Sequence, residues 1–189
     1  MAKTTFIGHR RIYYESEQIK QRLIAAIYDR INGGCRSFIV GSHGEFDEMA
    51  LAALRAARKK GDDITIEVAV TSISKINKKK GSDFVPYEDV KTVMFDVETE
   101  FYKRRIIASN RFMIDECDTI ICCVDERNYA SGAKTALNYA KKKGLTIINL
   151  FREDDCPTYK MTSAQKDAYI KNELEELTKT LESLNANKK

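Results

Sequence analysis

The chain has 189 residues, of which 43% are hydrophobic and 32% are charged, and its formal net charge is +4 at neutral pH. This length suits one domain with a well-formed core, and the composition is ordinary for a soluble globular protein. No apolar run is long enough to cross a bilayer, and the first five residues lack a signal-peptide core, so we expect a cytoplasmic protein with no membrane partner. The mild charge permits an anionic ligand but argues against nucleic acid as a partner, because nucleic-acid-binding domains usually concentrate more basic charge.

Apolar segments alternate between strand-like and helix-like patterns along most of the chain. In chain order, the pattern predicts a strand at 4–8, a helix at 15–32, a strand at 37–40, a helix at 46–60, a strand at 64–70, an irregular region at 71–90, a strand at 91–95, a helix at 101–117, a strand at 119–124, a helix at 133–143 and a strand at 145–150. Glycines follow three of the four helices and act as stop signals.

Strands that are separated by helices favour parallel pairing through right-handed crossovers. The near-continuous apolar run at 119–124 suits a strand covered on both faces. We therefore predict an α/β fold over residues 1–155, a Rossmann-like three-layer sandwich with a mostly parallel sheet. Residues 156–189 are predicted to form a C-terminal helical extension. Its helix at 163–184 carries a short heptad-like seam, which can pack on its own domain or form a dimer contact.

The five cysteines form no C-x-x-C pair, and no histidine follows them at zinc-finger spacing. We interpret them as reduced structural thiols. The two histidines, His9 and His43, have no third metal ligand at a suggestive spacing, so we expect no metal site, and we expect no cofactor.

Three loops leave predicted strands at the carboxyl edge of the sheet, where open α/β sheets bind their ligands. Each loop carries a glycine, which permits close backbone approach, and a helix N-terminus there attracts a negative group. We expect the loops to converge on one pocket that holds a phosphate. The predicted ligand-binding residues are Gly8, His9, Arg10, Gly41, Ser42, His43, Gly44, Phe46, Asp47, Asn110, Arg111, Ser131, Gly132, Ala133 and Lys134.

Several of these residues also have an ordinary structural interpretation. Arg10 can pair with a phosphate or bridge to a surface carboxylate. Ser131 can cap the helix that follows it and belong to an anion site at the same time. Asp47 can cap its own helix or accept hydrogen bonds from a ribose. The expected anion cradle is formed by the backbone of 41–44 and 131–134.

Known nucleotide and hydrolase motifs are absent from the sequence. There is no G-x-x-x-x-G-K-[ST], no G-x-G-x-x-G after the first strand and no G-x-S-x-G. P-loop NTPases, dinucleotide oxidoreductases and α/β-hydrolases are therefore poor interpretations of this chain.

Four motifs taken together resemble the SLOG superfamily. They are FIGHR at 6–10, GSHGEFD at 41–47, SNRFMIDECDTII at 109–121 and SGAKT at 131–135. This superfamily includes the Lonely-Guy phosphoribohydrolases, the DNA-processing protein A family and the YpsA-like bacterial proteins, and the similarity is greatest to the last group. The resemblance covers about residues 4–150. It implies a Rossmann-like fold, a nucleotide or nucleotide derivative bound by the glycine loops, and a homodimer.

Lonely-Guy enzymes cleave an N-glycosidic bond with an arginine and a glutamate. The resemblance places Ser109 and Asn138 at those two positions, so both catalytic groups are replaced. Glycoside cleavage requires a carboxylate, and Asp125 and Glu126 are the nearby candidates. We therefore expect a protein that binds a nucleotide-like phosphorylated small molecule as a sensor or sequestering protein. The alternatives are a nucleotide hydrolase or N-glycosidase, single-stranded DNA binding, and a mainly structural dimer.

Overall fold

The computed structural model describes residues 2–11, 16–71, 87–94, 102–127 and 131–153, together with residues 164, 165, 168, 171 and 172. The chain divides into two compact units, Met1–Arg152 and Glu153–Lys189. The seam of the predicted C-terminal helix and most of the predicted irregular region lie outside the described residues.

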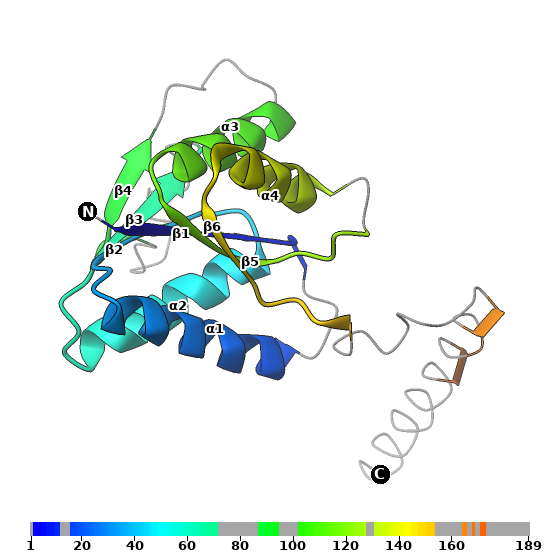
Figure 1. Cartoon of the computed structure of the whole chain (residues 1–189), viewed down its shortest axis with the longest axis horizontal. Coiled ribbons are helices and arrows are strands. Elements are labelled where there is room, and N and C mark those ends of the chain that lie inside the picture. Colours follow the sequence, from blue (N-terminus) through cyan, green and yellow to red (C-terminus); the bar gives the residue numbers. More distant parts are fainter. Residues whose placement is uncertain are drawn as a thin grey trace, which may run out of the picture. The chain divides into compact units, whose positions relative to one another are not determined.

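The first unit contains one parallel sheet (Figure 1). Its strands are β1 (Lys3–Gly8), β2 (Ser37–Val40), β3 (Thr65–Val70), β4 (Lys91–Met94), β5 (Thr119–Cys123) and β6 (Thr146–Asn149), and their order across the sheet is β4-β3-β2-β1-β5-β6. The chain builds outward from β1 to β4 and then returns to add β5 on the other side of β1. The strand order therefore reverses between β1 and β5, which is where open α/β sheets form a crevice.

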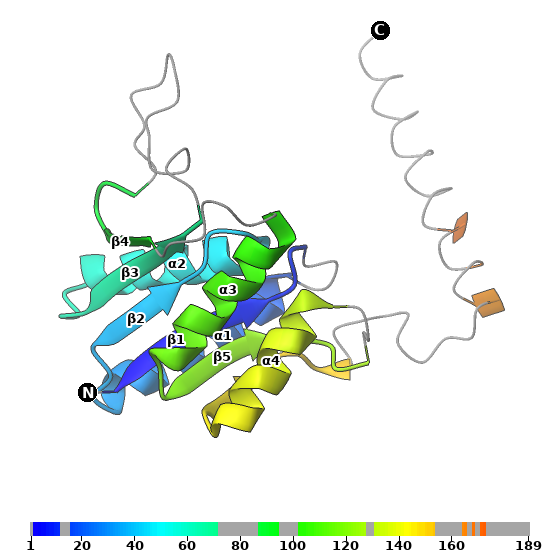
Figure 2. The same cartoon turned by 90° about the horizontal axis from the view of Figure 1, so that it is seen from above.

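Four helices cover the two faces of this sheet (Figure 2). They are α1 (Ser16–Asn32), α2 (Glu45–Lys59), α3 (Tyr102–Asp115) and α4 (Gly132–Lys143). Helices α1 and α2 lie together on one face, and α3 and α4 lie together on the other. This arrangement confirms the predicted three-layer α/β fold, and the predicted ends differ from the observed ones by a residue or two, as expected where helices fray.

The core consists of two clusters, one on each side of the sheet. Successive residues of a strand point to opposite faces. Phe6 accordingly packs on the α1 and α2 side, where its ring centroid lies 6.3 Å from that of Phe38, and Ile7 packs on the α3 and α4 side with Met113 and Leu137. Every residue of β5 is buried, as the continuous apolar run predicted.

The described cysteines of the first unit form no disulfide bonds. They are Cys35, Cys117, Cys122 and Cys123, whereas Cys156 lies outside the described residues. Burial raises the pKa of Cys117 and of Cys122 to about 12, so neither forms a thiolate at neutral pH.

One carboxylate joins three strands of the sheet. Glu67 on β3 is 7% exposed, and its two oxygens bind the ammonium groups of Lys3 on β1 and Lys91 on β4. The Lys3–Glu67 distance is 2.6 Å. Burial by itself would raise the pKa of Glu67, but the hydrogen bonds from the two lysines outweigh it and hold that pKa below the ordinary value of 4.5.

Replacing Glu67 by glutamine is expected to lower the free energy of unfolding by about 2 kcal/mol at neutral pH, because the buried hydrogen bonds lose their charge. Since the folded-state pKa of Glu67 lies below the unfolded one, this contribution is complete above pH 4.5 and disappears as the pH falls further. Urea denaturation from neutral to acidic pH should show the wild type and Glu67→Gln converging in acid. Glu88→Gln, at an exposed carboxylate, is the matched control and should show no such pH-dependent difference.

Candidate functional site

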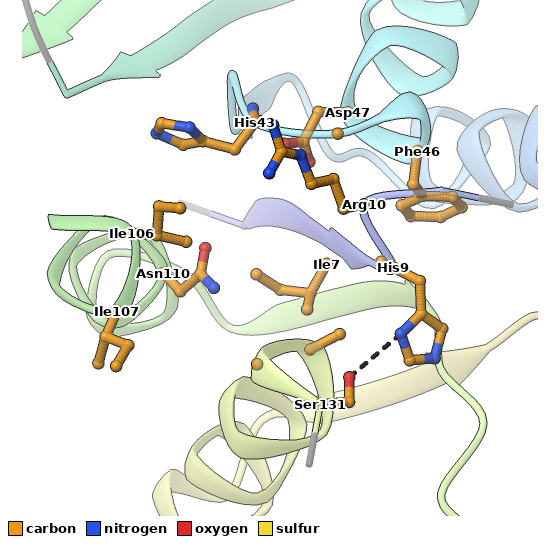
Figure 3. Close-up of a pocket in the computed structure, with 14 residues that line it drawn as sticks. Ile7, His9, Arg10, His43, Phe46, Asp47, Ile106, Ile107, Asn110 and Ser131 are labelled. Carbon is orange, nitrogen blue, oxygen red and sulfur yellow. Dashed lines mark hydrogen bonds between the residues drawn. The ribbon is translucent and has the colours of Figure 1, made fainter. Parts of the chain in front are cut away.

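A pocket of about 320 Å³ lies where β1, β2 and β5 end, beside the reversal of strand order (Figure 3). It is lined by Ile7, Gly8, His9, Arg10, His43, Gly44, Phe46, Asp47, Ile106, Ile107, Asn110, Ser131, Gly132 and Ala133. The structure thus brings together residues of all three predicted glycine loops. Four predicted residues do not line the pocket: Gly41, Ser42, Arg111 and Lys134.

Two glycines let the strand ends approach α2 closely. A Cβ atom on Gly8 would lie 2.4 Å from Cγ of Phe46, and a Cβ on Gly41 would lie 2.6 Å from Oδ2 of Asp47. Either Cβ would force the neighbouring side chain to move; at Gly8 the overlap includes Cβ of Phe46, so β1 and α2 would also have to separate. Gly41 therefore supports the pocket from behind, although it does not line it.

The first turn of α2 is not an open anion site. The backbone N–H of His43 donates to Oδ2 of Asp47 at 2.9 Å, and the N–H of Glu45 donates to the carbonyl of Arg10 at 3.1 Å. Acidic residues fill this turn, where they offset the helix dipole. Part of the predicted cradle at 41–44 therefore binds the protein's own carboxylate. That carboxylate is suited to accept a hydrogen bond from a ligand hydroxyl.

The remaining polar groups of the β2 loop bind the end of β3. The hydroxyl of Ser42 donates to the carbonyl of Ala69 at 2.9 Å, and Nε2 of His43 lies 2.9 Å from Oγ1 of Thr71. Ser42 is consequently a structural residue here, whereas His43 both lines the pocket and ties the loop to β3.

On the opposite side of the pocket, His9 joins the loops after β1 and β5. Its Nε2 accepts the backbone N–H of Asp125 at 3.2 Å, and its Nδ1 lies 3.1 Å from Oγ of Ser131 (Figure 3). A neutral imidazole that accepts at Nε2 carries its proton on Nδ1. Nδ1–H therefore donates to Ser131, and His9 does not act as a base toward the serine in this arrangement.

The pKa of His9 is consistent with this neutral form. Burial lowers it below the ordinary 6.5, and the nearby negative charge of Asp125 only partly opposes that effect. Oγ of Ser131 also accepts the N–H of Lys134 at 3.4 Å as the N-cap of α4. With both acceptor positions of that oxygen used, the hydroxyl proton of Ser131 is available to a group in the pocket.

The N-terminus of α4 supplies further donors. The first N–H groups of a helix have no intrahelical acceptor, and the cap satisfies only that of Lys134 here. The N–H groups of Gly132 and Ala133 belong to the residues that line the pocket. No acidic residue occupies the first turn of α4, in contrast to α2. This helix end, rather than that of α2, has the electrostatics of an anion site.

Two further polar side chains line the pocket. Arg10 is exposed, and among the described residues its guanidinium has neither an ion-pair partner nor a hydrogen-bond acceptor. The amide of Asn110 points into the pocket from α3 and has no partner within the same part of the chain (Figure 3). The site therefore offers a positive charge and an amide for a ligand.

Sequence analysis missed the apolar wall of the pocket, which Ile7, Ile106 and Ile107 form. Ile106 and Asn110 are four residues apart on α3, a spacing that places two side chains on the same face of a helix. From that spacing, Ile106 could have been predicted to line the same pocket as Asn110. Which face of α3 meets the pocket, however, depends on how the helix packs.

The carboxylates considered for catalysis do not line the pocket. Asp125 forms an ion pair with Arg127 at 2.7 Å, and Glu126 forms one with Lys141 at 2.7 Å. Burial would raise the pKa of Asp125, but the hydrogen bonds from Arg127 outweigh it and lower that pKa, so the group is an ionised ion-pair partner. Among the described residues, no three His, Cys, Asp or Glu side chains are grouped in a way that could hold a metal ion.

The fold and the pocket define a Rossmann-like domain with a ligand site at the reversal of strand order. No protein-family model matches the chain, and no curated protein matches its sequence. Among solved structures, the chain is similar to a DNA processing protein A from Helicobacter pylori, with 18% identity and a TM-score of 0.52. The match covers 77% of this chain and 63% of that chain. It supports a related fold, while the finer likeness to YpsA-like proteins stays a prediction.

That comparison corrects one expectation. The Helicobacter pylori structure is described for its single-stranded DNA binding mode, so the argument that a chain of this kind does not take nucleic acid as a partner was wrong. The physical reason is that net charge averages over the whole surface and does not report the charges around one site.

No helix in the described part of the chain has the length and apolar character needed to span a bilayer.

Gly8→Ala is expected to lower the free energy of unfolding by about 1–3 kcal/mol, because the new methyl group overlaps the ring of Phe46. Gly132→Ala is the matched control, since a Cβ there meets nothing within 4 Å and alanine is a better helix residue. Chemical denaturation of both variants measures the difference. Equal stability of the two would contradict the close contact between β1 and α2.

The imidazole of His9 should titrate below pH 6.5 when followed by NMR, because burial disfavours its charged form. A protonated Nε2 can also no longer accept the N–H of Asp125. Since the unfolded chain takes up the proton first, stability should fall as the pH drops below 6.5 and level off below the folded-state pKa. His9→Gln keeps an acceptor but does not titrate, so its stability should change less between pH 7 and pH 5. A His9 signal, assigned by its loss in His9→Gln, that titrates above 6.5 would contradict the proposed hydrogen-bond pattern.

Proposed function

We propose that the pocket binds one phosphorylated nucleotide unit, which single-stranded DNA or a free nucleotide can supply. The observation that carries this proposal is that several anion-binding groups line a single cavity (Figure 3). The guanidinium of Arg10, the hydroxyl of Ser131 and the first amides of α4 all border the same space.

The size of the pocket fits a ligand of this kind. Its volume of about 320 Å³ is at the small end of the roughly 300–1,000 Å³ that small-molecule sites occupy. One nucleotide matches such a space better than a dinucleotide does. The apolar side chains of Ile7 and Ile106 provide a surface for a base or sugar.

The polar groups also give the ligand an orientation. The phosphate binds at the start of α4, where no acidic residue opposes it. The sugar hydroxyls or the base edge then lie toward Asp47, whose carboxylate accepts hydrogen bonds, and toward the amide of Asn110. A phosphate placed instead beside Asp47 would meet a like charge.

Single-stranded DNA is one source of this unit, and the single-stranded DNA binding of the Helicobacter pylori protein of similar fold supports it. A free nucleotide is the other source, in which case the protein senses or sequesters it. Both sources present the same phosphate and base to the pocket, so binding experiments with each are needed to separate them.

Arg10→Ala is expected to weaken the binding of thymidine 5′-monophosphate by about 30-fold, or about 2 kcal/mol, because a charge-assisted hydrogen bond to phosphate is lost. Arg11→Ala removes the same charge from the neighbouring exposed residue, which does not line the pocket, and should change the affinity little. Isothermal titration calorimetry provides the dissociation constants.

The same titrations should include thymidine, which lacks the phosphate, and a short dT oligomer. Tighter binding of the oligomer at low salt identifies a strand as the ligand, and equal binding of the mononucleotide identifies a free nucleotide. If thymidine bound as well as its monophosphate, or if no probe bound, the proposed anion site would be refuted.

A further inference from the structure

A second hollow of about 300 Å³ lies between α3 and α4, which pack side by side (Figure 2). It shares Ile107, Asn110 and Gly132 with the pocket described above, so the two spaces adjoin. Its other lining residues are Arg111, Thr135, Ala136, Asn138, Tyr139 and Lys142.

The charges that line this hollow are all positive. Arg111 and Lys142 border it, and no acidic side chain does. Lys142 is exposed and has no ion-pair partner among the described residues. The neighbouring Lys143, by contrast, is paired with Asp115 at 2.6 Å and does not line the hollow. Two cations without a lining carboxylate attract an anion.

The hollow also has a fixed aromatic and apolar surface. The hydroxyl of Tyr139 donates to Asp115 at 2.9 Å, which holds the ring in place. The guanidinium of Arg111 lies 5.4 Å from the centroid of that ring, a cation–π arrangement that orients the charge. Ile107 is 41% exposed at the border with the first pocket. An amphipathic group with an apolar face and a negative charge fits these features.

We infer that this hollow, which we term the α3/α4 subsite, binds the nucleotide that follows the one in the pocket, so that the ligand is a single strand. The inference rests on the proposed function, because it extends the same ligand by one unit. The following phosphate lies near Arg111 and Lys142, and its sugar or base covers Ile107. The backbone of a strand passes the edge that Asn110 and Gly132 form between the two spaces.

A free mononucleotide uses only the first pocket, so the α3/α4 subsite gives a strand an advantage that a mononucleotide does not have. The wild type should bind the 5′-phosphorylated dinucleotide pdTpdT about tenfold more tightly than thymidine 5′-monophosphate at low salt, since a second phosphate is neutralised. This ratio of affinities is the quantity that the experiment measures.

The test uses Arg111→Ala and Lys142→Ala, each with the two probes above and with a dT oligomer. Each variant should lower the affinity ratio about threefold to fivefold, as expected for one exposed charge contact. Each should also reduce the slope of log affinity against log salt for the oligomer by about 0.7. Lys141→Ala is the matched control, because it removes the same charge from the adjacent residue of α4, which is paired with Glu126 outside the subsite.

The outcomes separate this inference from the proposed function. If the monophosphate binds in an Arg10-dependent way but the dinucleotide binds no better, the first pocket stands and the α3/α4 subsite is refuted. If Arg111→Ala and Lys142→Ala behave like Lys141→Ala, the subsite is likewise refuted. If neither probe binds the wild type, both proposals fail. Lys142→Gln, which keeps the length of the side chain, checks that the loss comes from charge rather than packing.

Discussion

The reversal of strand order between β1 and β5 is the constraint on which the rest of this structure depends. Crossovers from β1 through β2 to β3 place α1 and α2 on one face, and α3 before β5 and α4 after it lie on the other. The loops after β1, β2 and β5 consequently end at one edge of the sheet without a helix filling the space between them. A parallel sheet built in one direction only would have closed that space.

Close packing and hydrogen bonds make this site largely preformed. The ends of β1 and β2 lie against α2 because Gly8 and Gly41 have no side chain. Across the pocket, His9 links the backbone of Asp125 to the hydroxyl of Ser131. These hydrogen bonds occupy polar groups behind the pocket lining. The hydroxyl of Ser131 and the N–H groups of Gly132 and Ala133 are left to face the pocket. A ligand therefore meets donors that are already positioned, which reduces the entropic cost of binding.

The distribution of charge, rather than its sum, gives the site its chemistry. A net charge of +4 over the whole chain says little about one site, because the sum does not report where the individual charges lie. Lys141, for example, is paired with Glu126 and does not line the pocket. The first turn of α2 is acidic and the first turn of α4 is not. The glycine loops before α2 and α4 thus have different electrostatics, and of these two helix starts that of α4 suits a phosphate better.

The sequence by itself determined the elements and the class of fold, since apolar periodicity and the glycine stops are local properties. Gly144, for example, ends α4 with a φ of 78°, as its position after the predicted helix indicated. The predicted residues that line the pocket were also found through local patterns of strand, glycine and helix start. Tertiary structure alone decided that His9 links the loops after β1 and β5, that Ile106 forms a wall and that Arg111 belongs to a neighbouring hollow. Those facts depend on which face of each helix meets the sheet and on contacts between residues far apart in the chain, and no local pattern encodes them.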